Sequence, residues 1–199
     1  MTVQSSDGPP AVTGAWQRTP IEGAYVRRTP TFPDERGSFT ELWRTDWFDD
    51  LPEGTDALMR QANVSRSKPR VLRGLHLHRH QADFWVVAEG RAFVALVDVR
   101  PVLAGTGAAA VHTVEADPGT AIYVPAGVAH GFYAPEGLTL IYLVTNVYDG
   151  SDELGFAFDD PDVDVPWPDP EPVVSHRDRE AEGLAALIGR LRHDRVVDG

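Results

Sequence analysis

The chain has 199 residues, 42% of them hydrophobic and 24% charged, which suits one globular domain with a sizeable buried core. Because it contains no cysteine, disulfide bonds, thiolate metal ligands and a cysteine nucleophile are excluded. The formal net charge of −12 argues against nucleic acid as a partner, since that binding depends on Lys and Arg neutralising phosphates. No segment resembles a signal peptide or reaches the length of a membrane span, so we expect a cytoplasmic protein without a membrane partner.

Residues 1–15 are rich in Ser, Gly and Pro and predict a loose N-terminal arm on a single domain that covers residues 1–199. Short apolar runs then alternate with turn residues, a pattern typical of an all-β sandwich or barrel. The runs occupy residues 38–43, 57–65, 71–78, 83–90, 91–100, 110–116, 120–125, 129–134 and 138–148. Two dipeptides predict hairpin turns between neighbouring runs, namely Glu89-Gly90 and Glu136-Gly137.

The run over residues 92–99 is apolar at nearly every position, which predicts a strand covered on both faces. Residues 161–172 are too rich in proline to continue a sheet and predict a wrapping loop. A short C-terminal helix is expected over residues 178–194, because apolar side chains recur there at helical spacing. These side chains are Leu184, Leu187, Ile188 and Leu191.

Two short stretches carry side chains that can bind a metal ion. His76 and His78 are two residues apart, so both point to the same face of a strand, and Asp83 follows across a tight bend on the same expected strand pair. His130 ends a second stretch with the spacing G-x5-P-x-G-x2-H. Both stretches are similar to the two motifs of the cupin barrel. Three imidazoles and one carboxylate form a ligand set suited to Fe(II), Mn(II), Zn(II) or Ni(II).

Several collinear blocks between Asp34 and Asp178 carry a more specific resemblance. They read DERGSFTELW, QANVSRS, VLRGLH, ALVDVR, YVPAGVAHGF, FDDPDVDVPWP and SHRD. In this order they are similar to the dTDP-4-dehydrorhamnose 3,5-epimerases, nucleotide-sugar epimerases of the cupin superfamily. The resemblance implies an all-β, cupin-type double-stranded β-helix, or jelly-roll barrel, with a short C-terminal helix. It also implies a homodimer that exchanges N-terminal strands, and an isomerase acting on a dTDP-4-keto-6-deoxyhexose in deoxysugar or secondary-metabolite biosynthesis.

The resemblance also assigns catalytic roles. Epimerisation removes a proton from a carbon next to a ketone and returns one on the opposite face, which requires a base, an acid and a group that stabilises the enolate. In the family pattern, His76 takes the position of the base and Asp178 that of the carboxylate which orients it. Such a carboxylate fixes the imidazole tautomer and stabilises the imidazolium. Tyr142 matches the general acid.

Eight residues match the family's substrate site, and the reaction requires no cofactor in this interpretation. Arginine suits a diphosphate because its guanidinium binds two oxygens at once, and an aromatic ring can stack on a base. The matching residues are Arg36, Phe39, Glu41, Gln61, Asn63, Arg73, His130 and Tyr148.

Two departures from the family pattern fall at the candidate metal ligands. Asp83 stands where the family has an enolate-stabilising lysine, and His78 stands where the family has glutamine. One interpretation is a metal-free epimerase. Its enolate stabiliser must then be altered, because the carboxylate of Asp83 repels the developing oxyanion.

The alternative is a metal-dependent cupin enzyme with a changed reaction, in which His76, His78, Asp83 and His130 bind the ion. Because a metal-bound His76 cannot take a proton from carbon, Asp178 or Tyr142 is then the candidate base. A sugar-binding protein without catalytic activity is a third interpretation.

Overall fold

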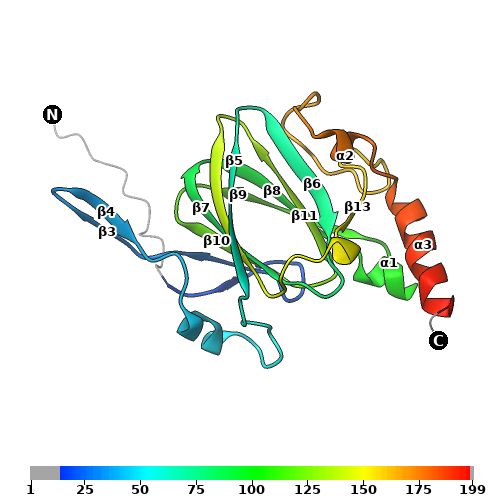
Figure 1. Ribbon diagram of the computed structural model, residues 1–199, viewed down its shortest axis with the longest axis horizontal. Coiled ribbons are helices and arrows are strands. Elements are labelled where there is room, and N and C mark those ends of the chain that lie inside the picture. Colours follow the sequence, from blue (N-terminus) through cyan, green and yellow to red (C-terminus); the bar gives the residue numbers. More distant parts are fainter. Residues whose placement is uncertain (1–13, 198–199) are drawn as a thin grey trace, which may run out of the picture.

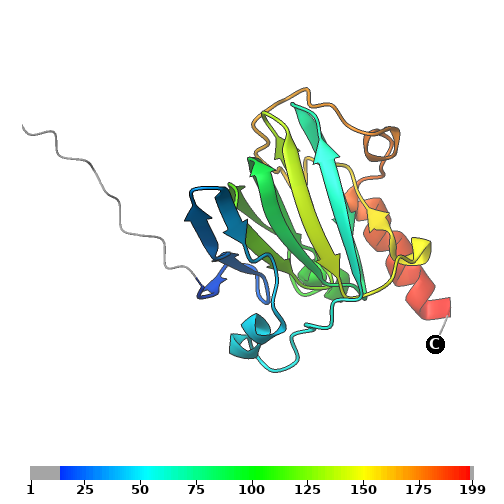
Figure 2. The ribbon, with the colours of Figure 1, turned by 60° about the vertical axis from the view of Figure 1, so that its left-hand side comes forward.

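The strands of the protein form two main antiparallel sheets that pack face to face (Figure 1). The computed structural model describes residues 14–197. The strands of these sheets are β1 (Gln17–Arg18), β2 (Tyr25–Arg28), β5 (Gln61–Ser67), β6 (Val71–Leu77), β7 (Asp83–Gly90), β8 (Ala92–Asp98), β9 (Ala110–Ala116), β10 (Thr120–Val124), β11 (Val128–Ala134), β12 (Leu138–Val144) and β13 (Leu154–Gly155). The six-stranded sheet has the order β1-β2-β10-β7-β12-β5, and the five-stranded sheet has the order β13-β6-β11-β8-β9. Figure 2 shows the six-stranded sheet in front, with β5 at its edge.

An apolar core fills the space between the two sheets. Trp85 of β7 and Phe132 of β11 belong to it, together with Val94 and Leu96 of β8. The opposite face of β8 contributes Ala95 to a second buried cluster outside the five-stranded sheet. The prediction that this strand is covered on both faces is confirmed.

The two predicted hairpins are wrong. β7 and β8 are joined at Gly90 but belong to different sheets, and the same holds for β11 and β12 at Gly137. Both glycines have positive φ angles, 80° and 102°, and a Cβ atom on Gly90 would lie 2.1 Å from the carbonyl oxygen of Gly137. The dipeptides therefore mark true turns, but each turn passes the chain from one sheet to the other. A local turn signal does not specify which strand becomes the partner.

The predicted helix over residues 178–194 is in fact two helices, α2 (His176–Arg179) and α3 (Leu184–Val197). The Asp160 carboxylate accepts a hydrogen bond from the Leu184 amide (2.6 Å) and thereby caps the start of α3. Asp160 belongs to the loop before α2, so a residue distant in sequence fixes where α3 begins. The predicted apolar stripe is confirmed, since its four residues are buried against the outer face of the five-stranded sheet. Residues 161–172 form a loop, as predicted.

A separate hairpin of β3 (Thr31–Asp34) and β4 (Gly37–Thr40) projects away from the barrel (Figure 1). Phe32 and Phe39 lie next to each other on it and are 55% and 66% exposed. The remaining helices are η1 (Thr45–Asp50), α1 (Arg100–Ala104) and η2 (Gly150–Asp152). Within residues 14–197 we find no helix long and apolar enough to cross a membrane. The arm predicted over residues 1–15 lies outside the described residues except for its last two.

Candidate active site

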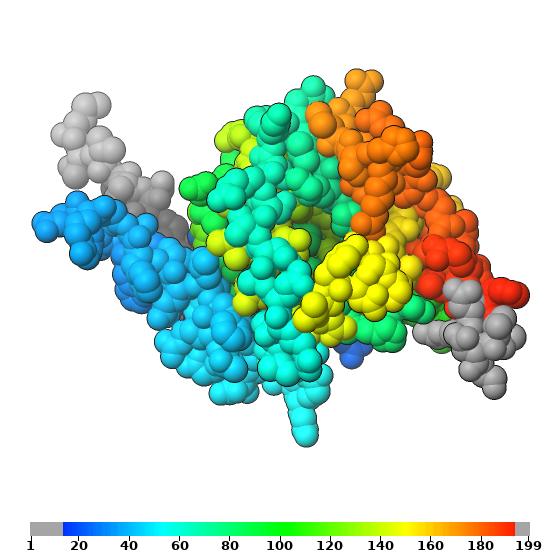
Figure 3. Space-filling model, viewed as in Figure 1, coloured from blue at the N-terminus to red at the C-terminus, as the bar shows by residue number. Residues whose placement is uncertain are grey.

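A cavity of about 260 Å³ lies between the two sheets and contains most of the candidate residues. Its walls come from β5, β6, β7, β11, β12 and the segment that follows β12. In Figure 3, β5 runs beside the yellow segment that carries η2. The Tyr148 amide of this segment donates a hydrogen bond to the side chain of Gln61 at the start of β5 (2.9 Å). The candidate residues that line the cavity are Gln61, Asn63, Arg73, His76, His78, Asp83, His130, Tyr142 and Tyr148.

His76 of β6 and Asp178 of α2 form a hydrogen-bonded pair at this cavity. Nε2 of His76 lies 2.9 Å from Oδ1 of Asp178, whose side chain is buried. Because the carboxylate accepts a hydrogen bond from Nε2, the lone pair of the neutral ring is on Nδ1. Burial opposes ionisation of Asp178, but hydrogen bonds from His76, Ser175 and the Gly74 backbone hold its pKa below the ordinary value. An ionised carboxylate thus lies behind a partly exposed imidazole, which suits general base catalysis.

Tyr142 lies on β12, opposite Trp85 of β7 in the strand register. Burial raises the pKa of its phenol, and the negative charges of Asp83 and Glu153 raise it further. The phenol therefore carries its proton at neutral pH and can donate it.

His78, Asp83 and His130 form a buried cluster in the cavity wall. One potential ligand atom from each lies within 4.8 Å of the other two, and Nε2 of His130 is 3.6 Å from Oδ2 of Asp83. Burial lowers the pKa of His130 to about 4, although the charge of Asp83 opposes this shift. Among residues 14–197, His76 does not join this cluster, so three of the four expected metal ligands gather and the fourth pairs with Asp178.

The expectation that Asp83 shares a strand pair with His76 and His78 is wrong. His76 lies on β6 and His78 directly after it, in the five-stranded sheet, whereas Asp83 begins β7 in the other sheet. The bend over residues 79–82 therefore crosses from one sheet to the other. The Asp152 carboxylate holds this bend by accepting hydrogen bonds from the amides of Arg79 (2.8 Å) and His80 (3.0 Å).

Sequence reasoning missed the residues that orient the buried cluster. Gln81 Nε2 donates to Oδ1 of Asp83 (2.9 Å), and Trp85 Nε1 donates to Oδ2 (3.1 Å). Trp85 is two residues from Asp83 on the same strand, so the alternation of a strand is a signal that identifies it. Asp152, whose carbonyl oxygen lies 2.9 Å from His78 Nδ1, is more than seventy residues away in sequence, and no local pattern indicates it.

The predicted substrate residues fall into two groups. Gln61, Asn63, Arg73, His130 and Tyr148 line the cavity. The other three, Arg36, Phe39 and Glu41, lie on or directly after the projecting hairpin and do not line it. Their role in substrate binding stays a prediction.

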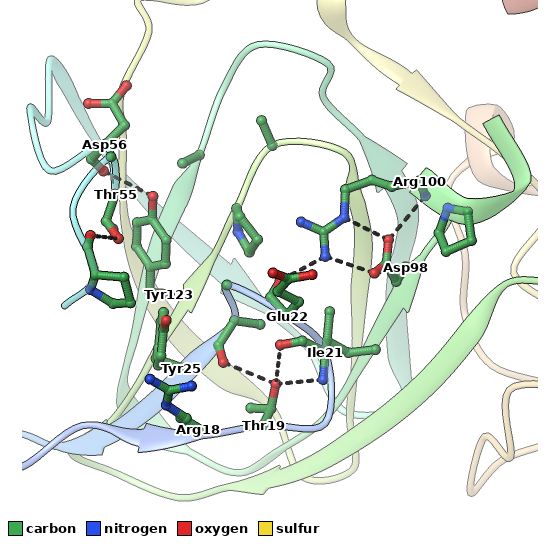
Figure 4. Close-up of a pocket in the computed structure, with 18 of the residues that line it drawn as sticks. Arg18, Thr19, Ile21, Glu22, Tyr25, Thr55, Asp56, Asp98, Arg100 and Tyr123 are labelled. Carbon is green, nitrogen blue, oxygen red and sulfur yellow. Dashed lines mark hydrogen bonds and ion pairs between the residues drawn. The ribbon is translucent and has the colours of Figure 1, made fainter. Parts of the chain in front are cut away.

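A larger cavity of about 810 Å³ lies elsewhere in the molecule (Figure 4). Several of its polar groups are already engaged. The Arg100 guanidinium donates hydrogen bonds to Asp98 and to the Glu22 carbonyl, and the Tyr123 hydroxyl donates to the Asp56 carbonyl. None of the predicted site residues lines this cavity, so the smaller one is the candidate active site.

Residues 18–186 match the family described as dTDP-4-dehydrorhamnose 3,5-epimerase. A dTDP-4-dehydrorhamnose 3,5-epimerase of Streptomyces griseus is 35% identical over 179 residues, which cover 85% of this chain and 86% of that protein. The structure of a 4-keto-6-deoxy sugar epimerase from the novobiocin gene cluster of Streptomyces spheroides covers 94% of this chain and 96% of its own, with 29% identity and a TM-score of 0.82. ChmJ, a 3'-monoepimerase from Streptomyces bikiniensis in complex with dTDP-quinovose, covers 87% of this chain and 89% of its own, with 32% identity and a TM-score of 0.75. These matches confirm the predicted cupin-type jelly roll, and the chain belongs to the dTDP-4-dehydrorhamnose 3,5-epimerase family.

Proposed function

We propose that the protein is an isomerase of the 3,5-epimerase type that acts on a dTDP-4-keto-6-deoxyhexose. The observation that carries this proposal is the 2.9 Å hydrogen bond between His76 and Asp178 at a cavity that also contains Tyr142. Family membership and the dTDP-sugar bound by the monoepimerase relative support the same substrate class. The relative from an antibiotic gene cluster supports a role in deoxysugar or secondary-metabolite biosynthesis.

The reaction begins when Nδ1 of neutral His76 takes a proton from a carbon next to the ketone. The electron pair of the broken C–H bond moves into an enolate, and the Asp178 carboxylate stabilises the new imidazolium through Nε2–H. Tyr142 then donates a proton to the carbon from the opposite face, which inverts the centre. Because the family resemblance implies a lysine at the position of Asp83, the enolate oxygen needs another source of positive charge in this chain.

We further propose a homodimer in which the β3–β4 hairpin of one subunit reaches the cavity of the other. Arg36 and Phe39 lie on this hairpin, outside the cavity of their own chain. Phe32 and Phe39 expose apolar surface there, and such surface often marks a contact with another protein. In the dimer, Arg36 and Arg73 would bind the diphosphate and Phe39 would stack on the base.

Binding of dTDP tests the substrate class. A ligand that binds only the native state stabilises it by about 2.7 kcal/mol at a hundredfold excess over its Kd. We expect dTDP to raise the melting temperature of the parent protein and Arg73→Ala to lose most of that rise. Arg91→Ala is the matched control, because Arg91 is an exposed arginine paired with Glu136. No rise with millimolar dTDP in the parent protein contradicts the proposal.

The metal enzyme with four ligands is not our proposal, because His76 is bonded to Asp178 and lies outside the buried cluster. The cytoplasmic location stays a prediction, as do the absence of nucleic-acid and membrane partners and the extent of a single domain over residues 1–199.

A further inference from the structure

The carboxylate of Asp83 is buried, and among the described side chains of residues 14–193 no lysine or arginine lies at ion-pair distance from it. Asp83 is 3% exposed, and its one partner at ion-pair distance among these described side chains is His130 (3.6 Å). Burying a carboxylate without a cation is costly, and here the reaction develops a second negative charge in the same cavity. The site therefore lacks a positive charge at the position where the family resemblance implies a lysine.

We propose that His78, Asp83 and His130 bind a divalent metal ion and that His76 stays outside the ligand set. One ligand atom from each of the three lies within 4.8 Å of the other two, and all three side chains are buried. Two imidazoles and a carboxylate suit Mn(II), Fe(II), Zn(II) or Ni(II). The binding of the ion is independent of the proposed epimerase function, whereas its catalytic role rests on that function.

Backbone carbonyls hold both imidazoles in the tautomer that a metal ion requires. Nδ1 of His78 lies 2.9 Å from the carbonyl oxygen of Asp152, and Nδ1 of His130 lies 3.1 Å from that of Val128. A carbonyl oxygen only accepts hydrogen bonds, so each Nδ1 carries the hydrogen and each Nε2 keeps its lone pair. Metal-bound histidines usually donate their second ring N–H in this way.

The carboxylate of Asp83 is oriented by neutral donors. Gln81 bonds one oxygen and Trp85 the other, at 2.9 Å and 3.1 Å. These bonds fix the plane of the carboxylate without cancelling its charge. Each oxygen keeps a further lone pair that can bind a cation.

Keeping His76 out of the ligand set removes the conflict between its two possible roles. Its Nε2 stays bonded to Asp178, and its Nδ1 remains free to take a proton from carbon. A divalent cation supplies the positive charge that stabilises an enolate oxygen, which is the task of the family's lysine. The electron pair of the broken C–H bond moves into the enolate and then forms the new C–H bond to the incoming proton. The reaction therefore needs no electron acceptor.

Metal content and Mn(II) electron paramagnetic resonance test the site. Protein without an affinity tag is stripped with a chelator, incubated with Mn²⁺ or Zn²⁺ and freed of unbound metal. We expect about one ion per chain, as for a single three-ligand site, in the parent and in His76→Ala. His78→Ala and the isosteric Asp83→Asn should lose the ion, whereas His80→Ala, which changes an exposed histidine in the neighbouring bend, should keep it.

A parent protein that binds neither ion at submillimolar concentration overturns the site, and so does a His78→Ala variant that binds as the parent does. Loss of the ion in His76→Ala overturns the three-ligand set in favour of a set that includes His76. The melting temperature of each metal-free variant, compared with that of the metal-free parent, checks that the variant keeps its fold.

Solvent exchange separates the two proposals. Stripped parent protein that still catalyses full deuterium exchange into a dTDP-4-keto sugar retains the epimerase function and overturns the role of the ion. Parent protein that binds the ion but neither binds dTDP nor catalyses exchange rejects the epimerase function and supports the metal site alone.

Discussion

In the proposed reaction His76 is the base, and the Asp178 carboxylate buried behind it orients and stabilises the imidazole. His76→Ala removes the proton acceptor and should slow proton exchange by about 10²–10⁴-fold. Asp178→Asn keeps the shape but favours the wrong tautomer, and its effect should approach about 10⁴-fold. His80→Ala serves as the control. Exchange rates within a few-fold of the parent in either variant contradict the assignment.

The pKa of Tyr142 gives a pH-dependent prediction. Burial and the charges of Asp83 and Glu153 raise this pKa above the ordinary value of 10.0, so the phenol loses its proton only at higher pH. Loss of the proton removes the acid, so the alkaline decline in exchange rate should lie above pH 10. The difference in tyrosinate absorbance between the parent and Tyr142→Phe reports the titration directly. Tyrosinate that forms at this position well below pH 10 would refute the prediction.

The side chains that line the cavity were predictable from the sequence where they belong to a local motif. His76, His78 and Asp83 line the cavity, as their motif predicts, because the motif needs only one strand and one bend. Their partners were harder to predict. Asp152 holds His78 from another part of the chain, and Asp178 was identified through the family resemblance, since no spacing in the sequence connects it to His76.

The turn at Gly90 should be much less tolerant of a side chain than an open turn. Gly90 has a φ angle of 80°, and a Cβ atom there would meet the Gly137 carbonyl oxygen at 2.1 Å. Gly54 has a φ angle of 89° and nothing within 4 Å of its Cβ position. We expect Gly54→Ala to lower the free energy of unfolding by roughly 1–2 kcal/mol, the conformational cost alone, and Gly90→Ala to lower it by clearly more. Equal losses in denaturant titrations would contradict this account of the turn.

Helix α3 should contribute to stability through its buried stripe. Leu187 is a residue of α3 and is 0% exposed, whereas Leu58, in the segment before β5, is 62% exposed. Leu187→Ala should lower the free energy of unfolding by about 2–5 kcal/mol, and Leu58→Ala should change it by less than about 0.5 kcal/mol. The two variants remove the same atoms, so similar values for both would show that α3 is not packed as described.

The existence of the strands was predictable from the sequence, and their pairing was not. Apolar runs and turn residues are local signals, and nine such runs correspond to strands in the structure. Whether a chain turns back within its sheet or crosses to the other depends on the closed barrel as a whole. The start of α3 likewise depends on a contact between distant parts of the sequence, because Asp160 caps it from a position 24 residues before Leu184.

The proposed dimer can be tested by mixing two damaged subunits. Arg36→Ala damages the hairpin and leaves the cavity intact, whereas His76→Ala damages the cavity and leaves the hairpin intact. If hairpins are exchanged, coexpressed mixed dimers should recover activity that neither variant has alone, because one intact hairpin meets one intact cavity. A mixture no more active than its separate components, or a monomeric protein by light scattering, would exclude the exchange.

Proton transfer at the carbons next to the ketone is the reaction on which every proposed catalytic role depends. Incubation of the parent protein with dTDP-4-keto-6-deoxyglucose in D₂O, followed by nuclear magnetic resonance, measures it directly. We expect deuterium at one or both carbons flanking the ketone, at a rate that is proportional to the enzyme concentration and about 10²–10⁴-fold lower in His76→Ala. A sugar nucleotide that binds but acquires no deuterium above the enzyme-free control would contradict the epimerase function.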